Sequence, residues 1–150
     1  MPPELRKARP QEIEEVRALI VAESMPAIEL ERWIEEFWLL DNGGTLAGCA
    51  GVEQYGEAAV LRSVAVAESL RGTGQGVRLV QHCLDYAKAN GAKRVYLFTM
   101  TASGFFPRFG FEPCSLEDFE PAARAAWQWR GNMEHEVLRK MLTPMRMQFD

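Results

Sequence analysis

The 150-residue sequence has few cysteines, few histidines and no long apolar run. Its three cysteines include no Cys-x-x-Cys pair, so neither a disulfide framework nor a cysteine-paired zinc site is predicted. The two histidines, His82 and His135, complete no metal-ligand pattern. A three-thiolate site for a soft metalloid would need Cys49, Cys83 and Cys114 to lie close together. This is not favoured, because Cys83 is expected on a helix and the other two cysteines on strands. We therefore expect no metal site and reduced, buried thiols.

The absence of apolar runs and the shortage of positive charge restrict the class of partner. No segment is long and apolar enough to cross a bilayer, and residues 1–7 contain no apolar signal core. The 17 Lys and Arg residues are outnumbered by 21 Asp and Glu residues, whereas broad nucleic-acid binding needs a basic surface. The sequence therefore predicts a cytoplasmic protein with neither a membrane nor a nucleic acid as partner.

Length and hydrophobic periodicity predict one mixed α/β domain over residues 1–150. Tight turns at 41–44 and 56–57 make the first strands antiparallel, whereas a helix crossing from strand 58–66 to strand 93–99 makes those two parallel. The expected strands cover residues 5–9, 37–41, 45–55, 58–66, 93–99, 111–115 and about 137–142. The expected helices cover residues 11–23, a segment from about 27, and residues 75–90, 101–109 and 117–127.

The strongest functional pattern is the stretch from Val64 to Gly76. An apolar strand passes through a polar turn into three glycines at alternate positions, Gly72, Gly74 and Gly76, and a helical pattern follows at once. Glycines let the main chain approach an anion, and the unpaired N–H groups of the first helical turn point at it. From composition alone, an ordinary strand-to-helix connection is the more frequent interpretation of such glycines. There is no Gly-Lys-Ser/Thr ending, and the glycine spacing is not that of a dinucleotide fold.

Two motifs together resemble one enzyme family. The spacing Arg71-x-x-Gly74-x-Gly76, behind the strand at 61–66, resembles the acetyl-CoA loop of the GCN5-related N-acetyltransferases. Residues 102–111, Ala-Ser-Gly-Phe-Phe-Pro-Arg-Phe-Gly-Phe, are similar to that family's short helix followed by Gly-Phe. The resemblance covers nearly the whole chain. It implies an α/β (α+β) fold with a mixed central sheet of about six to seven strands, an antiparallel N-terminal part, a parallel strand pair at the acyl-CoA site and about four flanking helices.

The same resemblance implies acetyl-CoA as cosubstrate and assigns residues to it. The main chain of residues 64–66 would pair with the pantetheine arm, and the amides of residues 71–77 would hold the pyrophosphate. The guanidinium of Arg71 is either a phosphate partner or part of a solvated loop residue. The expected cofactor-binding residues are Val64, Ala65, Val66, Arg71, Gly72, Thr73, Gly74, Gln75, Gly76, Val77 and Phe106.

Two charged residues lie on strands where burial is costly. Counting back across the turn at 56–57 pairs Tyr55 with Ala58, which puts Glu53 on the same sheet face as Arg62, one diagonal step away. Buried charges are paired or used, so a structural ion pair is one interpretation. The other is a catalytic pair, in which Arg62 grips a substrate carboxylate and Glu53 accepts the proton of the amine.

The general acid is where the sequence departs from the family. That family commonly places a Tyr in the short helix to protonate the departing thiolate, whereas here the position is Phe106. A phenyl ring cannot donate a proton, although a thiolate is a fair leaving group near neutral pH. The alternative donors in the sequence are Tyr55, Ser63, Thr99, Thr101 and Cys114.

The acceptor follows only from finer resemblances. Residues 46–53, 55–56, 61–66, 70–72 and 99–106 are similar to acetyltransferases of arsenic-resistance operons, which implies a glutamate-like acceptor such as arsinothricin or phosphinothricin. The strand bearing Arg62 also resembles short N-acetylglutamate synthases, whereas residues 127–133 depart from the arsenic-related group. Two further hypotheses are a non-catalytic acyl-CoA-binding sensor and a protein-modifying acetyltransferase. A homodimer is left open.

Overall fold

The computed structural model describes residues 2–150. The described chain forms two compact units, one of residues 2–52 and 61–85 and the other of residues 53–60 and 86–150. Within residues 2–150 the strands form a seven-stranded sheet in the order β1-β2-β3-β4-β5-β7-β6. No helix in that range is long and apolar enough to span a bilayer. That the chain is a single domain stays a prediction.

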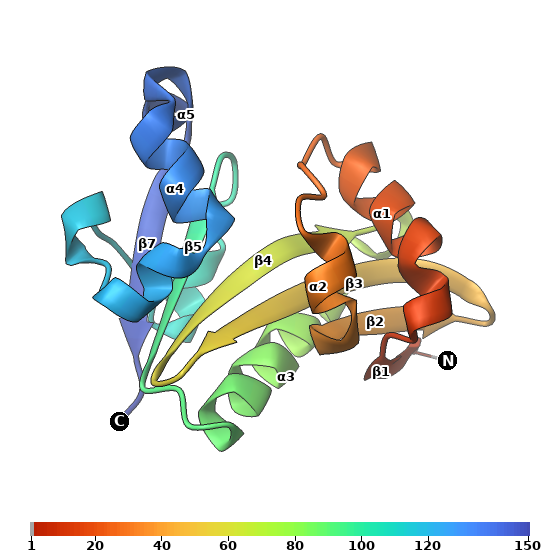
Figure 1. Cartoon of the computed structure of the whole chain (residues 1–150). Coiled ribbons are helices and arrows are strands. Elements are labelled where there is room, and N and C mark those ends of the chain that lie inside the picture. Colours follow the sequence, from red (N-terminus) through yellow and green to blue (C-terminus); the bar gives the residue numbers. More distant parts are fainter. Residues whose placement is uncertain (1) are drawn as a thin grey trace. The chain divides into compact units, whose positions relative to one another are not determined.

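The first unit contains an antiparallel set of strands. β1 (Glu4–Lys7) pairs with β2 (Phe37–Asn42), and β2 pairs with β3 (Thr45–Tyr55), with a register shift between Leu40 and Asp41. In Figure 1, α1 (Ile13–Ala22) and α2 (Leu30–Trp33) lie on one side of these strands and α3 (Gln75–Ala89) on the other. Both sheet faces are therefore covered, which explains why the burial of β3 runs almost continuously from Ala47 to Glu53.

A glycine on β3 makes the packing against β2 possible. Gly51 lies opposite Phe37 in the antiparallel ladder, and a Cβ added to Gly51 would come within 2.5 Å of the Phe37 ring. The ring of Phe37 is itself fully buried. Trp38, the next residue, points to the other face, where its ring meets His82 of α3 edge-on at 4.2 Å between centroids. His82 is therefore half-buried.

The second unit is built around β5. The start of β4 (Ala58–Val66) pairs in parallel with β5 (Arg94–Thr99) through three residue pairs, from Ala58–Arg94 to Val60–Tyr96. On its other side β5 pairs antiparallel with β7 (Thr143–Gln148), which also pairs with β6 (Glu112–Pro113). The predicted parallel pair is confirmed, because the α3 crossover returns the chain in the same direction.

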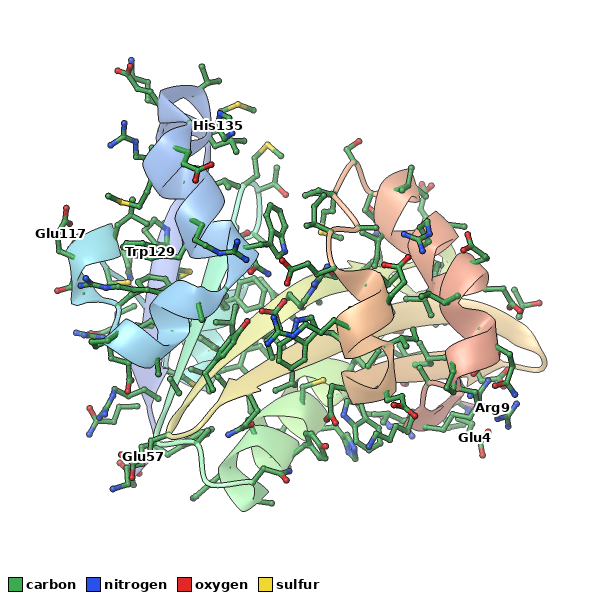
Figure 2. The ribbon with its side chains drawn as sticks, viewed as in Figure 1. Glu4, Arg9, Glu57, Glu117, Trp129 and His135 are labelled. Atoms are coloured by element: carbon green, nitrogen blue, oxygen red, sulfur yellow. The ribbon has the colours of Figure 1, made fainter. Side chains whose placement is uncertain are left out.

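The core of this unit joins the strands to the C-terminal helical segment. Tyr96 and Phe119 stack with centroids 4.4 Å apart, inside a buried cluster that also holds Val60 and Ala126. Trp129, labelled in Figure 2, packs against the cluster and donates its indole N–H to the carbonyl of Leu116 at 3.0 Å. Glu57, at the hairpin between β3 and β4 in the same view, forms an ion pair with Lys93.

Several element boundaries differ from the sequence prediction. Residues 137–142, expected as a strand, belong mostly to the helix α5 (Glu136–Met141), and the last strand is the later segment β7. The short helix expected at 101–109 is a 3-10 turn over 106–109 only, and the second helix begins at Leu30 rather than near 27. The expected insert at 117–127 consists of two 3-10 turns, over 116–118 and 121–125, followed by α4 (Trp127–Glu134).

A network of three charged residues ties β1 to β2 and to the start of α1. The guanidinium of Arg6 donates to both carboxylate oxygens of Glu12, at 2.9 and 2.6 Å, and to Asp41 at 3.2 Å. Glu12 also accepts the main-chain N–H of Arg9 and is 8% exposed. The hydrogen bonds from Arg6 outweigh desolvation and lower the pKa of Glu12 to about 2.

This shift predicts an acid-sensitive contribution to stability. The folded-state pKa of Glu12 lies below its ordinary value of 4.5, so the contribution is complete above that value and is lost as pH falls toward 2. We expect Glu12→Gln to lower the free energy of unfolding at neutral pH by about 2 to 3 kcal/mol and to flatten its fall between about pH 5 and pH 2. Urea unfolding across this range measures both effects.

The matched control is Glu15→Gln, because Glu15 is an exposed glutamate one turn away. It should change the free energy of unfolding by less than about 0.5 kcal/mol at any pH in the range. Parallel acid unfolding profiles for the wild-type protein and Glu12→Gln would contradict the assignment.

Candidate functional site

The predicted glycine loop joins β4 to α3 as expected. After β4 the chain makes a 3-10 turn over 68–70, and Arg71 is extended before the glycines begin. Gly72 and Gly74 have φ of +77° and +84°, a region that only glycine occupies without strain. Nothing lies within 4 Å of the position that a Cβ on Gly74 would take. The two glycines thus turn the chain into α3 and leave open space beside the loop.

The loop leaves several main-chain donors without acceptors. Within residues 2–150, the amide of Thr73 bonds to Leu70 and that of Arg78 bonds to Gly74, which is the first α-helical bond of α3. The amides of Gly72, Gly74, Gln75, Gly76 and Val77 have no main-chain acceptor in that range. A cluster of donors at the positive end of a 15-residue helix fits an anion such as a diphosphate.

Arg71 is engaged by the protein itself. Its Nη2 forms an ion pair with Glu23, the residue that ends α1, and its Nε donates to the carbonyl of Val66 at 3.3 Å. Its side chain is 53% exposed, so the pair is open to solvent. Neither sequence-based interpretation of Arg71 included this ion pair, because no spacing pattern connects residues 48 positions apart.

Residues 64–66 lie at the end of β4 that follows the β4–β5 ladder. The three β4–β5 pairs, from Ala58–Arg94 to Val60–Tyr96, lie in the second unit, whereas residues 61–66 of β4 belong to the first unit. Ala65 is buried, whereas Val64 and Val66 are partly exposed. In general, the main-chain N–H and C=O groups of a strand can pair with an extended ligand.

Arg62 is almost fully buried in the first unit. Its side chain is 4% exposed, and the guanidinium lies 5.6 Å from the centroid of the Phe37 ring. Its Nε donates to the hydroxyl of Ser63 at 3.1 Å. The aromatic face and the hydroxyl both stabilise a buried cation and restrict its orientation.

Glu53 is fully buried in the second unit, at the end of β3. Its Oε1 accepts the hydroxyl proton of Tyr55 at 2.5 Å, since residues two apart on a strand share a face. The predicted face shared by Glu53 and Arg62 stays a prediction. Tyr55, named as an alternative proton donor, already donates to this carboxylate.

Phe106, at the position of the family's usual acid, is packed, and the remaining residues named as proton donors differ in their exposure. Phe106 is 5% exposed and meets Phe105 and Phe111 edge-on at 5.1 and 5.8 Å between centroids. Thr99 accepts the amide of Ala102 at 3.0 Å, which fixes the turn after β5. Thr101 is exposed. Burial raises the pKa of Cys114 to about 11, so its thiol is neutral near pH 7.

The cysteines form no metal site. Cys49 and Cys83 are fully buried, and desolvation raises the pKa of both thiols, that of Cys49 to about 12. Among residues 2–150 no group of three or more metal-ligating side chains comes together. A surface hollow of about 360 Å³ between β1 and α3, lined in part by Arg78 and His82, contains none of the predicted site residues.

Sequence reasoning missed the conformation of Ser63. This residue lies within β4 but has a φ of +53°, in the left-handed region that β-strands do not use. Serine has no strong preference for that region, so the residue type carried no signal. The carbonyl of Ser63 accepts a hydrogen bond from the thiol of Cys49 at 3.3 Å.

Comparison with known proteins identifies a family and several relatives that match most of this chain. The model of the acetyltransferase (GNAT) family matches residues 5–111. The amino-acid acetyltransferase of Neisseria meningitidis is 28% identical over 114 residues, which are 75% of this chain and 26% of that protein. The amino-acid acetyltransferase of Ralstonia nicotianae is 31% identical over 103 residues, 67% of this chain and 23% of that protein. The chain thus spans about a quarter of the length of these relatives.

Solved structures show the same fold at lower identity. A Mycobacterium tuberculosis protein solved in complex with CoA has a TM-score of 0.82 at 19% identity, covering 99% of this chain and 100% of that one. The N-acetylglutamate synthase of Neisseria gonorrhoeae, solved with coenzyme A and N-acetyl-glutamate, has a TM-score of 0.81 at 23% identity. This match covers 98% of this chain and 35% of the synthase.

The loop geometry predicts the effect of a single methyl group. Gly74→Ala forces an alanine into a left-handed conformation, at a cost of roughly 1 to 2 kcal/mol, and shifts the amides of the loop. We expect the affinity for inorganic pyrophosphate to fall about five- to tenfold, measured by phosphorus NMR titration. Gly43→Ala is the matched control, because Gly43 also has a positive φ and open space but lies in the β2–β3 turn. Equal losses of affinity in both variants would contradict an anion site at the loop.

Proposed function

This chain belongs to the acetyltransferase (GNAT) family, and on that basis we propose that it transfers the acetyl group of acetyl-CoA to the amine of a small, carboxylate-bearing amino acid. The observation that carries the proposal is the set of amides without main-chain acceptors at the loop that leads from β4 into α3. The donors suit the pyrophosphate of CoA, and residues 64–66 suit the amides of its pantetheine arm. We assign no metal to the reaction.

The proposed reaction is a direct transfer in a ternary complex. The unprotonated amine nitrogen attacks the thioester carbonyl carbon, a C–N bond forms, and the C–S bond breaks with its electron pair leaving on sulfur. The amine proton passes to Glu53, directly or through water, and the thiolate takes a proton from solvent or leaves as the anion. Tyr55 would orient the Glu53 carboxylate through its hydroxyl.

Arg62 is the proposed partner of the acceptor's carboxylate. A guanidinium presents parallel N–H groups that match the two oxygens of a carboxylate, and burial strengthens the attraction. The acceptor class is supported by the relatives named amino-acid acetyltransferase and by the synthase solved with N-acetyl-glutamate. Glutamate is therefore the first acceptor to test, followed by phosphinothricin and arsinothricin, which an arsenic-resistance role would require.

Phe106 supports a second candidate function. A buried phenyl ring at the position where the family commonly has its acid provides no proton donor, as expected for a non-catalytic acyl-CoA-binding sensor. Phe106 would then contact only the acyl or pantetheine part of the ligand. The two functions share the CoA site and differ in turnover, so one assay separates them.

The first test of the proposed function is thiol release from acetyl-CoA with a panel of free amino acids and a peptide library. We expect turnover with glutamate or a glutamate analogue and none with peptides. Binding of CoA without turnover on any amine would favour the sensor, and acetylation of peptides alone would identify a protein-modifying enzyme.

The second test addresses Arg62. Arg62→Lys keeps the positive charge but loses the two-pronged geometry, so we expect the KM for glutamate to rise about tenfold or more while the KM for acetyl-CoA stays unchanged. Arg139→Lys, at an exposed position on α5, is the control and should leave both constants unchanged. An unaltered KM for every carboxylate-bearing acceptor would remove Arg62 from acceptor binding.

The third test addresses the ion pair of Arg71. Glu23 competes with a phosphate for the same guanidinium, so Glu23→Gln should strengthen CoA binding about two- to fivefold, as expected for loss of an exposed ion pair. Calorimetry at low and high salt measures the change, which should shrink as salt screens both anions. Glu14→Gln, on the same helix and paired with Arg17, is the control. Weaker binding after Glu23→Gln would mean that Glu23 holds Arg71 in its binding position.

A further inference from the structure

The contact between Arg62 and Ser63 breaks the geometry of a regular strand. Successive side chains of a β-strand point to opposite faces, so neighbouring residues cannot bond to each other through their side chains. Ser63 nevertheless accepts the Nε–H of Arg62 at 3.1 Å. Its left-handed φ of +53° is what interrupts the alternation and brings the hydroxyl to the side of the guanidinium.

A second contact holds the unusual conformation in place. The thiol of Cys49, on β3, donates to the carbonyl of Ser63 at 3.3 Å. Burial raises the pKa of this thiol to about 12, so it stays protonated and remains a donor throughout the neutral range. A left-handed serine is less stable than an extended one, and a partner for its carbonyl offsets part of that cost.

We propose that Ser63 is a positioning residue for acceptor selection: its hydroxyl fixes the plane of the Arg62 guanidinium, and Cys49 fixes the main chain that presents the hydroxyl. The proposal deepens the proposed function and rests on it, because it concerns the carboxylate that Arg62 is proposed to bind. With Nε bonded to Ser63, the hydroxyl sets the plane in which the guanidinium presents its Nη atoms. The Phe37 ring, 5.6 Å from the guanidinium, also limits its rotation.

Two substitutions distinguish the effect of the Ser63 hydroxyl from the effect of its backbone conformation. Ser63→Gly removes the hydroxyl but adopts a positive φ without strain, whereas Ser63→Ala removes the hydroxyl and retains the strain. If the hydroxyl positions Arg62, both variants raise the KM for glutamate about tenfold and leave the KM for acetyl-CoA unchanged. If only the backbone conformation matters, Ser63→Gly behaves as the wild-type protein, and the proposal is overturned.

The chain provides a matched control at Ser24. This exposed residue also has a left-handed conformation, with φ of +59°, so Ser24→Gly makes the same chemical change at the same backbone geometry. It should leave the KM for glutamate unchanged. A rise in this KM equal to that of Ser63→Gly would show a general effect of the substitution and overturn the proposal.

Hydrogen exchange at the Arg62 side chain reads the bond without any turnover. In protein labelled with nitrogen-15 at arginine, the Nε–H of Arg62 should exchange about tenfold faster in Ser63→Gly than in the wild-type protein. Cys49→Ala should speed this exchange to a smaller extent, and Cys49→Ser, which keeps a donor, should restore it. Unchanged exchange in Ser63→Gly overturns the assignment of the hydrogen bond.

These readouts distinguish failure of the inference from failure of the proposed function. An active wild-type protein whose KM for glutamate is unaffected in Ser63→Gly overturns the inference alone. A wild-type protein that acetylates no carboxylate-bearing amine overturns the proposed function and the acceptor role of Ser63 with it. In that case the exchange rate still decides whether Ser63 holds the guanidinium.

Discussion

The first turn of α3 cannot satisfy its own main-chain N–H groups, and the proposed chemistry begins with that constraint. An α-helix has no intrahelical acceptor for its first amides, so they bond to side chains, water or a ligand. Here the preceding glycines turn the chain so that further amides without main-chain acceptors, within residues 2–150, join the group. The result is a cluster of donors with a partial positive charge, independent of the net charge of −4.

The buried charged side chains also need hydrogen-bond partners, as the first amides of α3 do. Arg62 and Glu53 each have a hydroxyl partner very close in the sequence, Ser63 and Tyr55 respectively. Each hydroxyl adds a local hydrogen bond to a charge that burial would otherwise penalise. Among Arg6, Glu12 and Asp41, opposite charges pair directly and lock three elements together.

The sequence predicted the parts of the fold that depend on local rules. Glycine spacing located the loop before α3, tight turns set the antiparallel strands, and the crossover predicted the parallel pair. Residues 137–142 were misassigned because a short apolar run fits either a helix or a strand, and only pairing of the later β7 with β5 decides between them. The left-handed conformation of Ser63 and the ion pair of Glu23 with Arg71 could not be predicted from local patterns. Both involve contacts between residues that are distant in the sequence.

The absence of the family's tyrosine is consistent with catalysis if protonating the leaving thiolate is easier than deprotonating the attacking amine. The thiolate of CoA leaves with little help near neutral pH, because its conjugate acid has a pKa of about 8.5 by analogy with cysteine. The amine of an amino acid is mostly protonated at that pH, and only its neutral form attacks. Removing that proton is therefore the harder step, and the chain has a buried carboxylate, Glu53, suited to it. In the proposed mechanism, a proton donor at position 106 would assist the easier step, so we expect its absence to cost less than the loss of Glu53 would.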